Sequence, residues 1–287
     1  MIGQMLVNGL VNAALIAPPA VAFSMLFGIL RFPNFAIGGY ITIGVFAAYA
    51  FNVQLGLPLW VATLGAMCVG AAVVWATDRV IFRPMRASAP VTLLVVSISL
   101  TFVLEHLVRL VYGADVKGFD LPLERPLVFG NVRITLEQLY LIGAAVLIVV
   151  VTHVLLTMTR IGKAMRAMAD NQQLAEVRGI RSALVRSAVT LYCGALLGLC
   201  GVSAGLDLVI EPLLGWSLTI PIIAAAILGG IGSAYGAMLG ALLVGLAEEF
   251  AFLILPSAYK VGVGFVLIAI LLLLRPHGLF GQPEIKK

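Results

Sequence analysis

The chain has 287 residues, of which 62% are hydrophobic and 11% are charged, and its mean hydropathy is +1.11. This composition is far more apolar than the roughly half-apolar mix of a soluble domain, so it excludes a soluble fold. The net charge of +5 does not indicate a nucleic-acid partner, because the basic residues cluster as they do in the cytoplasmic loops of membrane proteins. We therefore expect one integral membrane domain over residues 1–287, surrounded by membrane lipid.

Apolar runs that approach the length of a bilayer crossing recur along the chain. A transmembrane helix needs about 20 apolar residues, and the candidate runs are 5–30, 35–52, 57–79, 91–112, 137–158, 186–210, 235–255 and 258–275. A further run, 217–231, is short for a crossing and favours a re-entrant or broken helix. The expected fold is an all-α integral membrane protein, a polytopic helical bundle of about eight to nine spans with one short or broken helix.

The basic residues predict the orientation of these spans. If residues 160–186 are cytoplasmic and the spans alternate, thirteen of the eighteen Lys and Arg residues lie on the cytoplasmic side. This bias places the N-terminus outside and the C-terminus in the cytoplasm, and it requires the short run 217–231 to cross.

Polar side chains inside the apolar runs are candidates for a solute path. The members of this set are Asn34, Thr42, Ser97, Ser99, Thr101, Ser203, Ser217 and Thr219. The alternative is that these hydroxyls bond only to carbonyls of their own helices, which is common in membranes. For the charged residues inside spans, a structural role is the simpler interpretation, since Glu105 and Arg109 have i,i+4 spacing and Asp207, Glu248 and Glu249 lie near helix ends.

Two segments lie between the spans and differ in character. The external loop 113–136 mixes Gly, Pro and charge with alternating apolar residues, which indicates a small hairpin around Gly130-Asn131. This loop is either a platform for an external partner or a solvated connector. The cytoplasmic loop 160–186 carries six of the eighteen basic residues.

An apolar stripe of helical period in the loop 160–186 predicts a short helix over Lys163–Arg178 that ends with a left-handed cap at Gly179. A loop that only sets topology would need neither feature, so we interpret the segment as a docking element. Its candidate contact residues are Lys163, Ala164, Met165, Arg166, Ala167, Met168, Ala169, Asp170, Glu176 and Gly179.

Small residues recur at helix-packing spacing in the C-terminal half. The first set is Gly229, Gly230, Gly232, Gly236 and Gly240, and the second is Gly194, Gly198, Gly201 and Gly205. Either set is typical of generic helix packing, and together they favour a compact, movable core. The three cysteines, Cys68, Cys193 and Cys200, all lie in apolar runs and indicate neither a disulfide nor a metal site.

The sequence shows no energy source or catalytic centre of its own. Walker A, HExxH and GxSxG motifs are absent from it. It also lacks the chain of buried carboxylates and histidines that a proton-coupled carrier needs. We expect no catalytic residues, no cofactor and no metal, and therefore a dependence on partner subunits for energy.

Three segments carry a resemblance to a known family. Arg160–Ile180 contains R-x-G-x-A-M-R-A followed by Gly179-Ile180, and Phe27-Gly28-Ile29-Leu30 leads to Asn34-Phe35-Ala36. Residues 224–237 read A-A-A-I-L-G-G-I-G-S-A-Y-G-A. Together these segments resemble the LivH-type permease subunits of ATP-binding-cassette importers for branched-chain amino acids, and the similarity spans nearly the whole chain.

The resemblance implies a permease domain in a bacterial cell inner membrane, with loop 160–186 as the coupling loop. It implies three kinds of partner: a second, LivM-like permease, two LivG/LivF-like ATPase subunits, and a periplasmic solute-binding protein. Where the family usually has His-Gly-Glu after N-F-A, this chain has Ile37-Gly38-Gly39, which favours a small neutral or zwitterionic solute. The alternatives are urea, short amides or other small solutes, an ion-coupled secondary transporter and, least favoured, a membrane enzyme.

Overall fold

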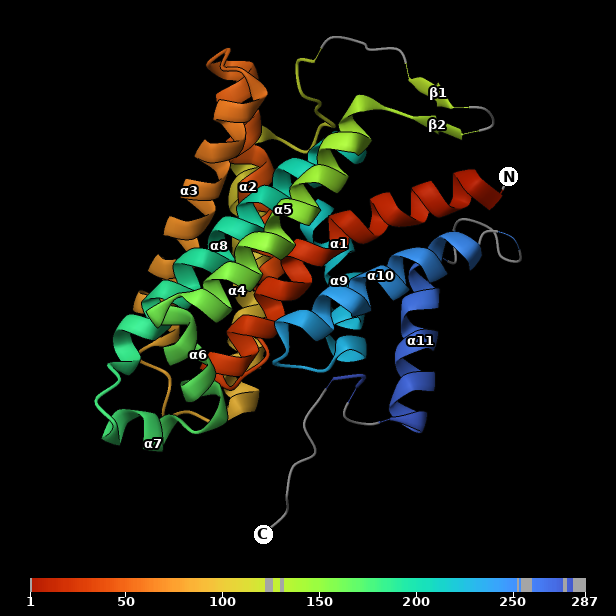
Figure 1. Ribbon diagram of the computed structural model, residues 1–287. Coiled ribbons are helices and arrows are strands. Elements are labelled where there is room, and N and C mark those ends of the chain that lie inside the picture. Colours follow the sequence, from red (N-terminus) through yellow and green to blue (C-terminus); the bar gives the residue numbers. More distant parts are fainter. Residues whose placement is uncertain are drawn as a thin grey trace.

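The protein is described from a computed structural model, which describes residues 2–121, 126–129, 132–251, 253, 260–275 and 278–280. Within these ranges the chain is almost entirely helical, with one small hairpin at one end of the bundle (Figure 1). The helices are α1 (Ile2–Leu30), α2 (Ile37–Tyr49), α3 (Leu59–Thr77), α4 (Pro90–Tyr112), α5 (Leu136–Met158), α6 (Arg160–Asp170), α7 (Gln172–Val177), α8 (Ser182–Asp207), α9 (Leu214–Gly229), α10 (Ala234–Ala251) and α11 (Lys260–Leu274).

Long apolar helices make this an integral membrane fold. Among the described residues, six helices are long and apolar enough to cross a bilayer: α1, α3 with its π-helical extension η2 (Asp78–Phe82), α4, α5, α8 and α10. The expected helical membrane bundle is confirmed, but the count of eight to nine spans is not. Three further helices are shorter: α2 has 13 residues before the π-helical segment η1 (Ala50–Gln54), α9 has 16 and α11 has 15.

Helix α2 lies at the centre of the bundle. Its residues Ile37, Tyr40, Ile41 and Val45 have at most 1% of their surface exposed, and α3, α4, α8 and α9 pack around it. A helix that is apolar on all sides is stable only in the interior of a protein or a membrane. The burial of α2 therefore follows from its composition, and its neighbours form the wall of the bundle.

Close helix packing in the bundle depends on glycine. A Cβ on Gly201 of α8 would lie 2.5 Å from the backbone nitrogen of Val45 on α2. A Cβ on Gly245 of α10 would meet the backbone nitrogen of Ala13 on α1. Because lipid tails are as apolar as the side chains, such close backbone contact supplies much of the association between membrane helices.

The hairpin consists of β1 (Leu127–Phe129) and β2 (Val132–Ile134), which pair antiparallel with Val128 opposite Arg133. The expected turn at Gly130-Asn131 lies outside the described residues. Gln4 fastens the hairpin to α1, because its side chain accepts from the Arg133 N–H at 2.7 Å and donates to the Arg133 carbonyl at 3.0 Å. The hairpin therefore covers the end of the bundle at which α1 begins (Figure 1).

Candidate functional site

Helices α6 and α7 lie at the end of the molecule opposite the hairpin (Figure 1). Thr159 begins α6, because its hydroxyl accepts from the Gly162 N–H at 2.9 Å and donates to the Leu155 carbonyl at 2.6 Å. Gly162 permits the tight corner after α5, since a Cβ there would overlap the Leu155 carbonyl oxygen and lie 2.6 Å from the Leu156 Cα. The Thr159 cap and the small Gly162 therefore allow the chain to turn sharply from α5 into α6.

The expectation of one continuous helix over Lys163–Arg178 is wrong. The helix stops at Asn171, whose φ of −151° and ψ of 103° are extended. The Asn171 side chain accepts from the Leu174 N–H at 3.0 Å and begins a second helix, α7. An asparagine oxygen that competes for backbone N–H groups favours a helix start over a helix interior.

The left-handed cap at the end of α7 is present as expected. Gly179 has a φ of +85°, its N–H bonds to the Glu176 carbonyl at 2.9 Å, and the Ile180 N–H bonds to the Ala175 carbonyl at 3.0 Å. These two bonds define a Schellman motif. Nothing lies within 4 Å of a Cβ built on Gly179, so its backbone conformation alone requires glycine.

The structure divides the predicted docking residues between two sides of α6. Met165 and Met168 are only 3% and 2% exposed and pack into the chain's own core. Arg31 secures the same helix by donating to the Ala169 carbonyl at 2.7 Å. In this chain, therefore, the two methionines fasten α6 to the bundle and are covered by it.

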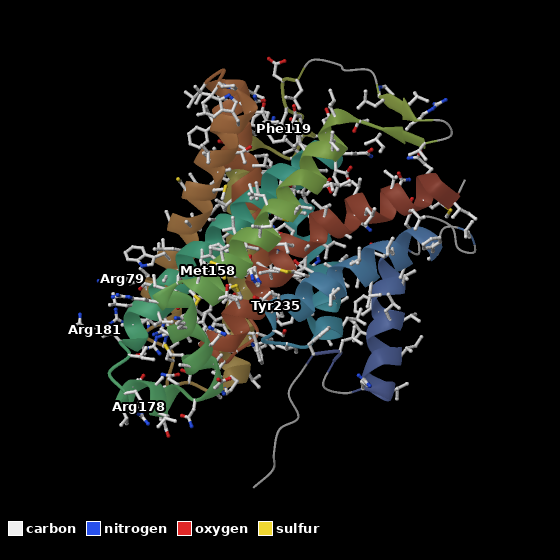
Figure 2. The ribbon with its side chains drawn as sticks, viewed as in Figure 1. Arg79, Phe119, Met158, Arg178, Arg181 and Tyr235 are labelled. Carbon is white, nitrogen blue, oxygen red and sulfur yellow. The ribbon has the colours of Figure 1, made fainter. Side chains whose placement is uncertain are left out.

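The exposed surface at this end is mixed polar and apolar. On α7, Leu174 is 56% exposed and Val177 is 84% exposed, and Arg178 and Arg181 extend from the same end (Figure 2).

Glu176 accepts from the Gln172 side chain at 3.0 Å. That bond, followed by one from Ser182, lowers the pKa of the Glu176 carboxyl below its usual value. Of the predicted docking residues on α6, Lys163, Arg166 and Asp170 are exposed, whereas Ala164, Ala167 and Ala169 are half-buried.

Three of the predicted path residues form a buried cluster that holds the connection between α1 and α2. Ser97 accepts from the Phe35 N–H at 3.0 Å, and Thr101 donates to the Phe35 carbonyl at 2.9 Å. Asn34 accepts from the Ala36 N–H at 3.0 Å. All three side chains are at most 2% exposed. Their polar atoms therefore form hydrogen bonds with backbone groups that have no helical partner. Non-helical backbone inside a membrane protein requires such partners.

Two more path residues gather at the start of α9. Thr42 of α2 accepts from the Gly215 N–H at 3.3 Å, and Thr219 donates to the Gly215 carbonyl at 2.9 Å. Glu105 of α4 is 1% exposed and faces the backbone of Trp216, whose ring lies 5.2 Å from that of Phe102. A carboxylate near the first turn of a helix stabilises the positive end of the helix dipole.

The remaining path residues are dispersed. Ser99 is exposed and bonds to the Val95 carbonyl of its own helix at 3.0 Å, and Ser203 is 6% exposed within α8. Ser217 is exposed, and of the eight predicted residues it is the one that lines the cavity described next.

A cavity of about 350 Å³ lies among α1, α9, α10 and the ends of α5 and α8. Two amides on α1 orient two carboxylates on α10: Asn8 donates to Glu249 at 2.9 Å and Asn12 donates to Glu248 at 2.8 Å. Gln138, Asp207 and Ser217 are the other polar residues of the lining among those described. The sequence favoured a structural role for these acids, and the asparagines are absent from the predicted site residues. The sequence signal for these residues is the i,i+4 spacing of Asn8 and Asn12, which places both amides on one face of an apolar helix.

The predicted packing glycines lie between α9 and α10. Gly236 contacts the backbone of Gly229, and Gly240 contacts that of Ala225. Gly230 and Gly232 lie in the intervening turn with φ values of 102° and 93°. Within the part of the chain that the structure describes, no group of three or more His, Cys, Asp or Glu side chains is arranged to hold a metal ion.

A bundle of apolar helices with a basic, amphipathic element at one end and a polar cavity near the other defines a polytopic membrane protein of the transport class. The profile of the family described as branched-chain amino acid transport system / permease component matches residues 5–273. The chain belongs to that family.

Curated relatives match over nearly the whole chain. It is 32% identical to the high-affinity branched-chain amino acid transport system permease protein BraD of Pseudomonas aeruginosa, covering 99% of this chain and 97% of BraD. It is 30% identical, with the same coverage, to the permease protein LivH of Escherichia coli K12.

Among solved structures, PsaBC from Streptococcus pneumoniae in complex with Fab matches 98% of each chain, with a TM-score of 0.51 and 13% identity. This last likeness supports the fold alone.

Proposed function

We propose that this chain is a permease subunit of an ATP-binding-cassette importer and that it carries a small polar solute, most directly a branched-chain amino acid. Family membership and two relatives that are named branched-chain amino acid permeases support the transport role and the substrate class. The subunit contributes a solute path and has no ATPase site or other catalytic role of its own.

The proposed assembly contains a second, LivM-like permease, two LivG/LivF-like ATPase subunits and a periplasmic solute-binding protein. It lies in a bacterial inner membrane, with α6–α7 and the C-terminus in the cytoplasm and the hairpin outside. In this topology α2, α9 and α11 also cross, which gives nine passes. The basic surface at the α6–α7 end supports this orientation, because positive loops remain in the cytoplasm.

The observation that carries the proposal is the construction of the α6–α7 element. Its inner face is held by Met165, Met168 and Arg31, while Leu174 and Val177 remain exposed beside Arg178. A rigidly mounted apolar contact with a charged rim matches the usual anatomy of a binding hot spot. We therefore assign ATPase docking to the exposed face of α7 and the rim charges Lys163, Arg166, Asp170 and Glu176, with Met165 and Met168 as supports.

This docking assignment predicts a local effect of charge on α7. Val177→Glu places a carboxylate in the apolar centre of the contact. This change should weaken the binding free energy to the ATPase subunits by about 2 kcal/mol or more. The measurement is the amount of ATPase that co-purifies with the permease, together with ATP-driven uptake. Val128→Glu on the hairpin is the matched control, because Val128 is also exposed, at 62%. Equal ATPase recovery with both variants would refute docking through α7.

The solute path is proposed to run between the two permeases past α4 and α9. Ser99 and Ser217 are its exposed hydroxyls. The buried members of the predicted set, Asn34, Thr42, Ser97, Thr101, Ser203 and Thr219, support its walls. The alternative function is an ion-coupled secondary carrier. Uptake measured in reconstituted proteoliposomes distinguishes this carrier from an importer.

A further inference from the structure

The cavity between α1 and α10 has a lining that is divided by polarity. One part is aliphatic and consists of Val11, Leu15, Ile16, Leu218 and Pro221. Among the described residues, the other part contains three carboxylates, three amides and one hydroxyl, and none of its described members is Lys or Arg. A volume of about 350 Å³ falls at the lower end of the range of small-molecule sites, about 300–1,000 Å³.

The carboxylates on α10 are held in place. Asn8 donates to Glu249, and Asn12 donates to Glu248, so each acid is fixed by an amide from the helix across the cavity. Among the described residues, Glu249 forms no ion pair within 4.0 Å. The amide bond orients the Glu249 carboxylate without neutralising its charge, and Glu249 lies half-buried in the last turn of α10, where the helix dipole disfavours a negative charge. This cost favours a positively charged ligand group as the counterpart.

We propose that this cavity is a transient subsite for an aliphatic amino acid, with the ammonium group against Glu249 and the branched side chain against Val11, Leu15 and Leu218. The Gln138 amide, whose oxygen already accepts from the Thr135 N–H at 3.2 Å, directs its NH₂ donors to the ligand carboxylate. This inference rests on the proposed function, and it adds the chemical basis on which the permease itself distinguishes solutes.

The cavity lies at the end of the bundle where a solute would enter the proposed path. Gln138 lies in the first turn of α5, directly after the hairpin, and Asp207 ends α8. Both therefore belong to the end of the bundle that faces outward in the proposed topology. A solute released there would meet the carboxylates before it reached the buried start of α9.

The first test uses the unaltered, assembled importer without its binding protein. Equilibrium binding of radiolabelled leucine is measured, with two unlabelled competitors. The competitor 3-methylbutylamine keeps the ammonium group and lacks the carboxylate, whereas 4-methylpentanoate keeps the carboxylate and lacks the ammonium group. We expect leucine to bind weakly, 3-methylbutylamine to displace it, and 4-methylpentanoate to fail. Displacement by 4-methylpentanoate as effective as by the amine, or no leucine binding at all, would overturn the inference.

The second test removes one charge with little change in shape. Glu249→Gln retains an oxygen that accepts from Asn8, so the fastening of α1 to α10 persists while the negative charge is lost. Leucine binding should weaken about tenfold, the usual scale for a hydrogen bond to a charged group. Glu211→Gln is the control, because Glu211 is exposed at the same end and lies outside the cavity lining. Unchanged leucine affinity in Glu249→Gln would contradict the subsite.

These outcomes are separable from those of the proposed function. ATP-driven leucine uptake by the complete importer that does not depend on Glu249 would leave the importer assignment intact and remove the subsite. Absence of ATP-driven uptake of any amino acid would refute the proposed function, whatever the binding measurements show.

Discussion

At the scale of single residues, hydroxyl groups join segments that lie far apart in the sequence. Thr42 accepts from the N–H of Gly215, which is 173 positions away, and donates to the Pro212 carbonyl at 3.4 Å. Thr42 itself is fully buried. Its hydroxyl therefore satisfies a backbone donor at the start of α9 that no water can reach.

Thr42→Val tests this role, because valine has nearly the same shape and lacks the hydroxyl. Loss of the acceptor leaves the Gly215 N–H buried without its partner and should destabilise the protein by about 1 kcal/mol. The measurement is the unfolding midpoint of the purified complex. Thr63→Val is the control, since Thr63 bonds only to the Leu59 carbonyl of its own helix. If both variants unfold at the same midpoint, Thr42 does not hold α9.

At the scale of elements, the corner between α5 and α6 determines where α6 and α7, the proposed docking element, lie. Gly162→Ala places a methyl group against the Leu155 carbonyl and the Leu156 Cα, which are backbone atoms that cannot rotate away. We expect α6 to shift, with loss of co-purifying ATPase and several-fold lower uptake. Gly143→Ala in the middle of α5 has open space around the new methyl group and should behave as the parent protein does. Retained coupling in Gly162→Ala would mean that the corner tolerates displacement.

The same elements show how far sequence reasoning extends. Hydropathy located the helices, and the Gly179 cap followed from local rules that need no tertiary information. Periodicity identified Met165 and Met168 as one face of a helix, but it could not show whether the chain or a partner covers that face. The contacts of Asn8 and Asn12 with α10 cross more than two hundred positions. Such pairings depend on the packing of the whole bundle and leave no local signature.

At the scale of the whole molecule, α1 connects the two candidate functional regions. Its first half lines the cavity through Asn8 and Asn12, and Arg31, directly after its end, bonds to α6. With 29 residues, α1 is about 43 Å long, which is enough to extend through the hydrocarbon core of a bilayer. The cavity and the proposed docking element therefore belong to opposite ends of one helical bundle.

This arrangement predicts opposite accessibility for the two ends. In a protein with Cys68→Ser, which removes the exposed native thiol, Val128→Cys should react with a membrane-impermeant maleimide added to intact spheroplasts. Gln173→Cys on α7 should react only after the membrane is permeabilised. Both positions are exposed, so accessibility depends on the side of the membrane alone. The reverse labelling pattern would invert the proposed topology.

The most direct test of the importer assignment is uptake of radiolabelled leucine into proteoliposomes. The permease pair is reconstituted with its ATPase subunits, and the binding protein is supplied on the outward-facing side. We predict accumulation that requires ATP, the ATPase subunits and the binding protein together, and none with an ion gradient in their absence. Leucine accumulation by this chain alone under a proton or sodium gradient would contradict the account and establish a secondary carrier.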